Sequence, residues 1–199
     1  MTAVVSAFLL TACTTSGGTG EISGSSAAFK QALRVCSGYG CVIKDKFRFS
    51  RKDLNRLKSI MASGKRSAAA ERRAVARAIG TMERMARAKL RYRPDVKLSY
   101  IINSGKRGQM DCVDESLNTT GYLRYLHANG LLRHHTPDRG YAERGLIIDG
   151  RYPHKSASMR DKSGIRWTVD SWYKPDGKAA QIMKYSAWKR VRNSSSSYR

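Results

Sequence analysis

The sequence predicts an α+β domain in which helices come first and a small antiparallel sheet follows. Apolar residues recur at helical spacing between residues 54 and 61, and again between 67 and 90. After His135 the pattern changes to short apolar runs separated by turn residues, as expected for strands. With 199 residues, 41% of them hydrophobic, the chain can form one globular domain with an ordinary core.

The first two predicted helices form a basic N-terminal part of the domain, at about 50–93. Ser50 is followed by Asp53 at the spacing of a capping box, which predicts the start of a helix at this point. A second, longer helix is expected from about Ser67 to Leu90. Pro94 closes it, because proline disfavours helical backbone at the residue before it.

A third helix is predicted to begin at Asp111 or Cys112. Asp111 is a suitable N-cap, and Asp114 and Glu115 place negative charge in the first turn, where the helix dipole favours it. Asn129-Gly130 is a C-terminal stop signal. Cys112 is therefore expected at the N-terminus of this helix.

Strands are predicted in the C-terminal part from apolar runs and turn residues. Asp149-Gly150 is a hairpin turn signal, and Asp161–Gly164 joins the next two runs. The expected strands are Leu146–Ile148, His154–Met159 and Ile165–Trp172, with a last strand or turn at Ile182–Trp188. Residues 28–36 are expected to form either a short helix or an extended arm.

The N-terminus is predicted to be an export signal of residues 1–12. Its apolar stretch is too short to span a bilayer, and Leu10-Thr11-Ala12-Cys13 resembles a bacterial lipobox, in which the cysteine is lipidated. An ordinary signal peptide or an uncleaved apolar tail is the alternative. The expected location is the bacterial cell envelope, in the periplasm and anchored to a membrane through lipid on Cys13.

The signal peptide sets the expected domain organisation. Residues 13–27 are rich in Gly, Ser and Thr and are expected to form a flexible tether. The folded domain then covers residues 28–192. Residues 193–199 include four serines and are expected to be a disordered tail.

The other three cysteines divide into a pair and a single thiol. Cys36 and Cys41 are separated by a loop with two glycines, and in an oxidising compartment we expect them to form a disulfide. A zinc site at these two cysteines would need a second ligand pair at similar spacing, and the sequence has none. Cys112 is left as the unpaired thiol of an exported protein, which makes it the candidate for chemistry.

A histidine and an aspartate lie in the two strands that the Asp161–Gly164 loop joins. If the turn is centred near 162–163, His154 and Asp170 lie opposite each other or within one position, close enough for their side chains to interact. A register shift of one residue would place them on opposite faces of the sheet. The spacing therefore permits a His154–Asp170 pair without requiring one.

The remaining histidines are less suitable partners for Cys112. His127 lies 15 residues further along the same predicted helix. At a rise of about 1.5 Å per residue it is about 22 Å away. His134 and His135 lie beyond the helix end and could return only through a long loop.

Structural roles for these residues are the simpler alternative. A lone buried cysteine is more often a small core side chain than a nucleophile, and a lone histidine on a strand is more often a hydrogen-bonded structural residue. A metal site made of Asp111, Cys112, Asp114 and a histidine has no recognised ligand spacing. No metal and no cofactor is therefore predicted.

If Cys112, His154 and Asp170 meet, they form a cysteine nucleophile system. Asp170 would fix the tautomer of His154, and His154 would take the proton of Cys112 and later give it to the leaving group. The N-terminus of a helix favours the thiolate, so the sequence predicts a lowered pKa for the Cys112 thiol. The backbone N–H of Cys112 would face the developing oxyanion.

The order of these residues resembles the transglutaminase-like cysteine proteinase superfamily, with His about 40 residues after Cys and Asp 16 residues further on. Asp111-Cys112-Val113-Asp114 is similar to the Asp-Cys-x-Asp of its bacterial periplasmic branch. Over about residues 70–190, the chain resembles a group of proteobacterial periplasmic proteins and lipoproteins. The motifs that carry this resemblance are Asp111–Ser116, Gly130–His135, Pro153-His154 and Val169–Trp172.

The resemblance implies both a fold and a set of catalytic residues. The implied fold is transglutaminase-like or papain-like, with Cys at the N-terminus of a central helix packed on a small antiparallel sheet. His and Asp then lie on neighbouring strands of that sheet. Matching the motifs residue by residue assigns the triad to Cys112, His154 and Asp170. The resemblance implies no particular substrate.

Positive charge is concentrated in residues 51–107, which hold 17 Lys and Arg against 4 Asp and Glu, within a chain of net charge +23. The region has few aromatic residues for base stacking and no DNA-reading motif, so nucleic acid is not the expected partner. Anionic lipid head groups or another anionic envelope polymer are the expected partners of an anchored protein. The alternative is a solvated basic surface without a partner.

The sequence therefore predicts a lipid-anchored periplasmic cysteine hydrolase or acyltransferase. It is expected to act on amide bonds of a peptide, protein or peptidoglycan substrate through Cys112, His154 and Asp170. The alternative is a catalytically inactive protein that uses the same transglutaminase-like fold as a binding or structural module of the envelope.

Overall fold

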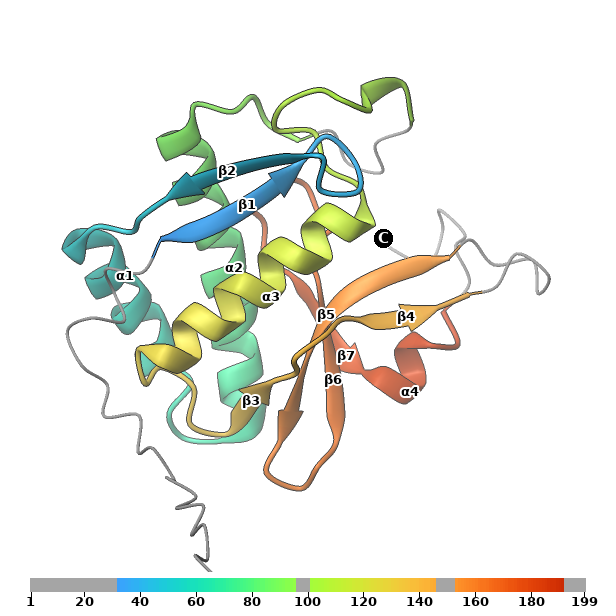
Figure 1. Cartoon of the computed structure of the whole chain (residues 1–199). Coiled ribbons are helices and arrows are strands. Elements are labelled where there is room, and N and C mark those ends of the chain that lie inside the picture. Colours follow the sequence, from blue (N-terminus) through green and yellow to red (C-terminus); the bar gives the residue numbers. More distant parts are fainter. Residues whose placement is uncertain (1–31, 96–100, 146–152, 192–199) are drawn as a thin grey trace, which may run out of the picture.

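The computed structural model describes residues 32–95, 101–145 and 153–191, which fold into four α-helices and two antiparallel sheets (Figure 1). The chain therefore belongs to the α+β class that the sequence predicts. The expected signal peptide, tether and C-terminal tail lie outside the described residues, as does the expected strand at 146–148 with its turn. Within the described ranges, no helix combines the length and the apolar character needed to cross a membrane.

Helix α1, Arg51–Ala62, begins at the capping box that the sequence predicts. The Ser50 hydroxyl accepts the backbone N–H of Asp53 at 3.2 Å, and the Asp53 carboxylate accepts the backbone N–H of Ser50 at 2.8 Å. These bonds satisfy donors that the first turn of a helix leaves without partners. The buried face of α1 consists of Leu54, Leu57 and Met61.

Helix α2, Ala68–Leu90, packs beside α1. The hydroxyl of Ser67 caps it by accepting the backbone N–H of Ala70 at 3.1 Å. The helix ends at Arg91, which adopts a left-handed conformation with a φ of 56°, before it reaches the proline expected to close it. Gly80 allows a loop to cross α2 closely, because a Cβ atom at this position would lie 2.2 Å from the backbone oxygen of Lys178.

Strands β1, Leu33–Ser37, and β2, Ile43–Phe47, form an antiparallel hairpin, with Val35 opposite Asp45. Of the two conformations expected for residues 28–36, the described part is the extended one. The sequence pattern does not reveal β2, because three consecutive charged residues separate Ile43 from Phe47 and only Phe47 is buried. A strand without a continuous buried face carries a weak periodic signal.

Helix α3, Cys112–Ala128, is the central element of the fold. As the sequence predicts, Asp111 caps it by accepting the backbone N–H of Asp114 at 2.9 Å, and the helix ends just before Asn129. The helix runs between the β1–β2 hairpin and the larger sheet, and also contacts α2 (Figure 1). These neighbours explain why buried residues surround much of α3 instead of forming one stripe.

The larger sheet has five short strands in the described part of the chain. They are β3, His135–Pro137, β4, Ala142–Arg144, β5, His154–Asp161, β6, Arg166–Asp170, and β7, Gln181–Lys184. The order is β3-β5-β6-β7, and β4 pairs with the N-terminal part of β5. The short helix α4, Tyr185–Trp188, follows β7, so the last predicted element is a strand followed by a helical turn.

Candidate active site

His154 and Asp170 form a buried pair on one face of the larger sheet. His154 opens β5 and Asp170 ends β6, and His154 Nε2 lies 2.7 Å from Oδ2 of Asp170. The ladder pairs Ala157 with Val169, which by extension places Asp170 opposite Ser156. The predicted register, with His154 and Asp170 within one position of each other, is therefore wrong. An offset of two residues keeps both on the same face as diagonal neighbours, because side chains alternate with a period of two.

Asp170 accepts a second hydrogen bond on the same oxygen. The indole N–H of Trp188, in α4, donates to Oδ2 of Asp170 at 2.9 Å. Trp188 is 1% exposed, so this bond is shielded from water. Two donors on one oxygen hold the carboxylate in a single orientation. The sequence carries no signal for this contact, since it depends on how β7 and α4 return to the sheet.

Three aromatic rings surround the His154 imidazole. The ring centroids of Trp172, Tyr173 and Trp188 lie 5.0, 4.8 and 5.6 Å from that of His154. The Nδ1 atom of His154 is buried and has no hydrogen-bond partner among the residues that the structure describes. Because Nε2 is bonded to Asp170, Nδ1 is the ring atom left to exchange a proton.

Cys112 occupies the first position of α3 and is partly exposed. The backbone N–H of Lys155, the residue after His154, faces the Cys112 sulfur. This contact joins the N-terminus of α3 to the start of β5, so Cys112, His154 and Asp170 share one neighbourhood. Within the described part of the chain, Nδ1 of His154 has no bonded partner, so the thiol and the imidazole are not hydrogen-bonded in this arrangement.

Burial raises the pKa of the Cys112 thiol, and the carboxylates of Asp111 and Asp170 raise it further. The backbone N–H and the ammonium group of Lys155 act in the opposite direction without reversing the shift. The predicted lowering of the Cys112 pKa is therefore wrong. Burial and two nearby negative charges outweigh the helix N-terminus, and the thiol needs a base to become a nucleophile.

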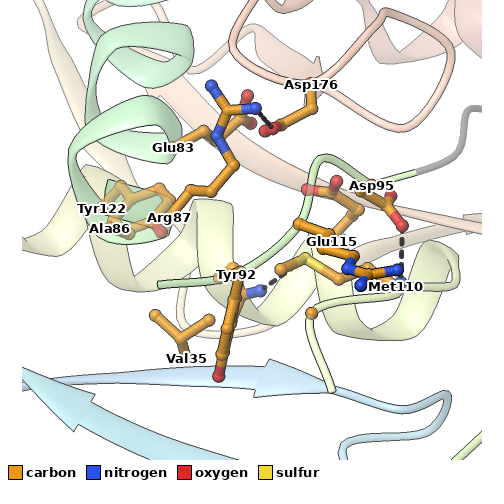
Figure 2. Close-up of a pocket in the computed structure, with 13 residues that line it drawn as sticks. Val35, Glu83, Ala86, Arg87, Tyr92, Asp95, Met110, Glu115, Tyr122 and Asp176 are labelled. Atoms are coloured by element: carbon orange, nitrogen blue, oxygen red, sulfur yellow. Dashed lines mark hydrogen bonds and ion pairs between the residues drawn. The ribbon is translucent and has the colours of Figure 1, made fainter. Parts of the chain in front are cut away.

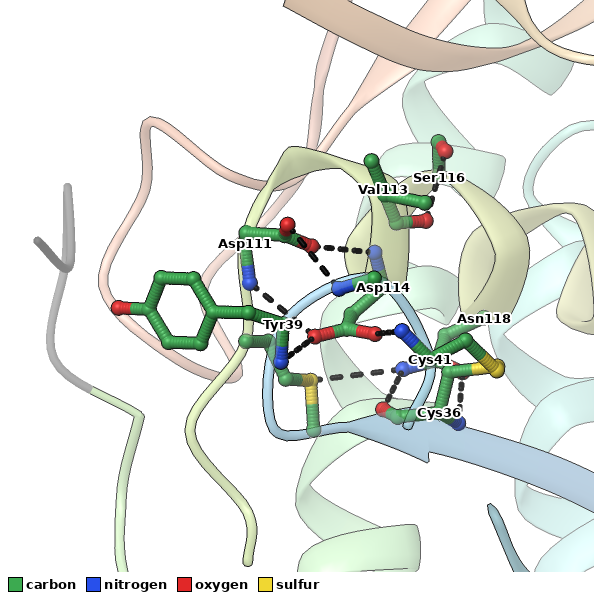
Figure 3. Close-up of a disulfide and its surroundings, with 10 residues drawn as sticks. Cys36, Tyr39, Cys41, Asp111, Val113, Asp114, Ser116 and Asn118 are labelled. Atoms are coloured by element: carbon green, nitrogen blue, oxygen red, sulfur yellow. Dashed lines mark hydrogen bonds between the residues drawn. A yellow bond between two sulfur atoms is a disulfide. The ribbon is translucent and has the colours of Figure 1, made fainter. Parts of the chain in front are cut away.

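A disulfide-bonded loop holds the N-terminus of α3 (Figure 3). Cys36 and Cys41 are joined at the tip of the β1–β2 hairpin. The Asp114 carboxylate, in the first turn of α3, accepts the backbone N–H groups of Tyr39 and Cys41 at 2.8 and 2.6 Å. The two cysteines thus stabilise the loop on which the helix that begins at Cys112 is anchored.

The loop and the first turn of α3 together hold the one group of metal-ligating side chains found in the described residues. Ligand atoms of Cys36, Cys41 and Asp114 lie within 4.8 Å of one another. The two sulfurs are bonded to each other, so neither is available as a thiolate ligand. Asp111, Cys112, Asp114 and a histidine do not form such a group in the described ranges.

The remaining described histidines make other contacts. Nδ1 of His135 lies 2.8 Å from the buried carboxylate of Glu71, which also accepts the backbone N–H groups of Arg133 and His134 at 2.6 and 2.9 Å. Burial raises the pKa of Glu71, but these hydrogen bonds outweigh it, and the net pKa is lowered. The motif that contains His134 and His135 therefore ties the start of β3 to α2. His127 is exposed near the other end of α3.

Ser171 fixes the end of β6 against α3. Ser171 directly follows Asp170, and its hydroxyl donates to Oε2 of Glu115 at 2.8 Å and lies 3.2 Å from the hydroxyl of Thr119. Glu115 lies one turn along the helix from Cys112. These bonds tie the end of β6, which carries Asp170, to the first turns of α3, which begins at Cys112. Sequence reasoning places Ser171 in a strand but provides no signal for its partner.

Glu115 also lines a small cavity with other carboxyl groups (Figure 2). The cavity volume is about 20 Å³, enough for one water molecule. Glu83 and Asp176 contribute to its wall, and Asp176 pairs with Arg87 at 3.1 Å. Burial and then the neighbouring Asp176 raise the pKa of Glu83 to about 8, and burial raises the pKa of Glu115 well above its usual range. Glu83 is therefore largely protonated at neutral pH.

Comparison with protein-family models, curated proteins and solved structures gives no match for this chain. A functional assignment therefore depends on the contacts of Cys112, His154 and Asp170 and on the chemistry that those three side chains can perform.

Proposed function

We propose that the protein is a cysteine hydrolase or acyltransferase that acts on amide bonds, with a transglutaminase-like arrangement of Cys112, His154 and Asp170. The single observation that carries the proposal is the buried His154–Asp170 pair. Nδ1 of His154 has no hydrogen-bond partner among the described residues, and Lys155 is the next residue along the chain. The Lys155 backbone N–H faces the Cys112 sulfur, so a nucleophile, a base and an orienting carboxylate are neighbours.

Each side chain has one role in the proposed reaction. Nδ1 of His154 takes the proton of the Cys112 thiol as the sulfur attacks the carbonyl carbon of the substrate. The carbonyl oxygen becomes an oxyanion, which the backbone N–H of Cys112 at the helix N-terminus stabilises. The C–N bond then breaks, and His154 returns the proton to the leaving amine. Water or an acceptor amine resolves the remaining thioester.

The raised pKa of Cys112 determines when the proton moves. A thiol of raised pKa is largely neutral near pH 7, so proton transfer to His154 accompanies the attack and does not precede it. Asp170 stabilises the imidazolium that results, and Trp188 holds Asp170 in place.

The proposal includes the fold family and the location. A central helix that begins at Cys112 and packs on β5, with Asp170 on the next strand, supports a transglutaminase-like fold. The lipobox-like segment that ends at Cys13 supports a lipid anchor in the bacterial envelope. In that location a peptide, protein or peptidoglycan amide is the proposed substrate class.

The test uses hydroxylamine as the acceptor, because it traps an acyl thioester whether the natural reaction is hydrolysis or transfer. The purified protein is incubated with glutamine peptides, peptide amides and peptidoglycan fragments, and hydroxamate formation is measured. We expect hydroxamate from at least one substrate class, none with Cys112→Ala, and a loss of about a hundredfold or more with His154→Ala.

A matched control is His127→Ala, which removes an exposed histidine at the far end of the same helix. Its activity should equal that of the unchanged protein. Hydroxamate formation that survives Cys112→Ala, or that falls equally in both histidine variants, would exclude the proposed mechanism.

The second candidate is a catalytically inactive binding module of the envelope. The observation that favours it is the neutral, partly buried Cys112 thiol, which is not hydrogen-bonded to His154 in the described arrangement. An inactive module would give no hydroxamate with any substrate class. Its Cys112→Ala and His154→Ala variants would also bind envelope ligands as tightly as the unchanged protein.

A further inference from the structure

An open groove of about 500 Å³ runs along the outer face of α3. One wall is β1 with the disulfide-bonded tip of the hairpin, and the other is the segment 139–141 between β3 and β4. The floor is formed by Leu117, Thr120 and Gly121 of α3. Leu117 is 37% exposed there, an unusual position for a large apolar side chain on an otherwise well-buried helix.

Four cationic side chains from four different segments line this groove. Arg34 comes from β1, Lys44 from β2, Arg124 from α3 and Arg139 from the β3–β4 connection, and all four are exposed. Arg124 donates a hydrogen bond to the backbone oxygen of Arg139, which joins the floor to one wall. Among the described residues that line the groove, no carboxylate balances these charges.

The carboxylates nearest in sequence are committed elsewhere. Asp45 follows Lys44, but both of its oxygens accept hydrogen bonds from Arg107. Asp138 precedes Arg139, but its two oxygens accept hydrogen bonds from Arg160 and Arg166. Asp114, near the hairpin tip, accepts backbone N–H groups of the disulfide loop. The groove therefore presents a concave positive surface, which suits a ligand that carries several negative charges.

The groove is connected to the neighbourhood of Cys112, although Cys112 does not line it. Leu117 lies five residues along α3 from Cys112, a displacement of about 7.5 Å along the helix axis at a rise of about 1.5 Å per residue. On the wall formed by the segment 139–141, the Tyr141 hydroxyl accepts a hydrogen bond from Lys155 Nζ at 3.0 Å. The backbone N–H of Lys155 faces the Cys112 sulfur. Lys155 therefore links the groove residue Tyr141 to the proposed nucleophile.

We propose that this groove binds an acidic segment of a peptide substrate and so positions a neighbouring amide bond at Cys112. Binding of the acidic segment rests on the groove itself. Positioning of the amide bond at Cys112 rests on the proposed function. A peptide of alternating glutamate and small apolar residues matches a floor with one exposed leucine between walls of Arg and Lys.

A nucleic acid fits the same surface less well. Single-stranded nucleic acid binds through aromatic rings on which bases stack, in addition to its phosphates. Of the two tyrosines that line the groove, Tyr125 is 2% exposed, and the Tyr141 ring is covered by the Lys155 ammonium group, 4.4 Å from its centroid. The Tyr125 ring is therefore inaccessible to a base, and one face of the Tyr141 ring is already occupied.

The experiment measures binding of a fluorescein-labelled peptide of alternating glutamate and alanine by fluorescence anisotropy. The Cys112→Ala protein is used as the parent so that turnover cannot affect the signal. In that background, Arg34→Gln with Lys44→Gln removes two groove charges. Arg66→Gln with Arg73→Gln is the matched control, because it removes two exposed charges of the α1–α2 region, outside the groove.

We expect the groove variant to raise the Kd about tenfold and the control variant to change it less than about twofold. Added salt should weaken binding by the parent, and a glutamine–alanine peptide should bind far more weakly. Equal losses in the two variants would show general attraction to a basic surface and overturn the proposal. So would a fluorescein-labelled oligonucleotide that binds tighter than the peptide and loses affinity in the groove variant.

The two proposals fail separately. If the acidic peptide binds in the groove but no substrate yields hydroxamate, the groove proposal is supported and the proposed enzymatic function is contradicted. The groove variant is also prepared with Cys112 intact. If it forms hydroxamate with unchanged KM for both acidic and neutral substrates, the enzymatic function is supported and the groove proposal is contradicted. Matching circular dichroism spectra and melting temperatures establish that each variant is folded.

Discussion

Trp188 donates its indole N–H to Oδ2 of Asp170 at 2.9 Å, and the same oxygen lies 2.7 Å from Nε2 of His154. The short helix α4 is therefore part of the candidate active site, although it is the last described element of the chain. Arg144 lies over the Trp188 ring, with its guanidinium carbon 4.9 Å from the ring centroid, and adds a further contact to the indole. The orientation of His154 consequently depends on residues far from the Cys112 motif.

Trp188→Phe is expected to lower kcat about tenfold and leave KM nearly unchanged. The phenyl ring keeps most of the packing against His154 but removes the donor to Asp170, and losses of this size are usual when a contact that orients a site residue is removed. Hydroxamate formation measured across substrate concentrations tests this. Tyr185→Phe, which removes a hydroxyl bond on the same helix, should leave both constants unchanged. Equal effects of the two substitutions would contradict a positioning role for Trp188.

Asp170→Asn is expected to lower kcat by about a hundredfold or more while the protein stays folded. The amide has nearly the same shape as the carboxylate, but it cannot stabilise an imidazolium and it favours the wrong tautomer of His154. The comparison is Asp161→Asn, at the turn of the same hairpin, where the carboxylate bonds to Ser163 and Trp167. If Asp161→Asn reduced activity as much as Asp170→Asn, hairpin stability and not the His154–Asp170 pair would explain the loss.

Asp111→Asn is expected to speed the alkylation of Cys112 by iodoacetamide near neutral pH. The Asp111 carboxylate helps to raise the pKa of the thiol, so neutralising it lowers that pKa and increases the thiolate fraction at a fixed pH. Asparagine is as good an N-cap as aspartate, so α3 should keep its start. The rate is followed across pH by mass spectrometry of the peptide that contains Cys112.

The rate of Cys112 alkylation is expected to change with pH in a defined direction. In the unchanged protein the rate should rise with pH up to and beyond the usual pKa of a cysteine, and Asp111→Asn should shift the whole curve to lower pH. Asp53→Asn, at the N-cap region of α1, is the control and should leave the curve in place. A curve that does not move with Asp111→Asn would show that this carboxylate has no effect on the thiol.

Local features of the fold could be predicted from the sequence because their causes lie within a few residues. Ser50 and Asp111 were identifiable as helix caps from the acidic residue three positions later. The spacing of His154 and Asp170 permitted a same-face relation without requiring it, because a register shift of one residue would have separated them. The exact partner positions did not follow, because the turn at 161–165 fixes the register through its own hydrogen bonds.

Features that depend on tertiary packing could not be predicted in the same way. The pKa of Cys112 follows burial and the approach of Asp170, neither of which its neighbours in sequence encode. Trp188 and the Ser171–Glu115 bond bring together residues 18 and 56 positions apart with no spacing rule to connect them. The hairpin strand β2 escaped prediction because a two-stranded ribbon over a helix buries only part of one face.

Glu83→Gln is expected to stabilise the protein at alkaline pH and to have little effect near pH 5. Burial and Asp176 raise the folded-state pKa of Glu83 to about 8, above its ordinary value of 4.5. The stabilising contribution of the protonated form is therefore complete below about pH 4.5 and is lost as pH rises through about 8. Glutamine mimics the protonated form, so the variant should melt several degrees higher at about pH 8.5.

Thermal unfolding at the two pH values, followed by circular dichroism, measures this difference directly. The groups that face Glu83 are Asp176, Glu115 and Ser171, with the backbone N–H of Gly177 and the charge of Arg84, and the substitution leaves all of them in place. Glu143→Gln changes an exposed carboxylate, 61% accessible, and should shift the melting temperature equally at both values. A Glu83→Gln variant whose stabilisation is the same at about pH 5 and about pH 8.5 would show that Glu83 is already ionised throughout this range.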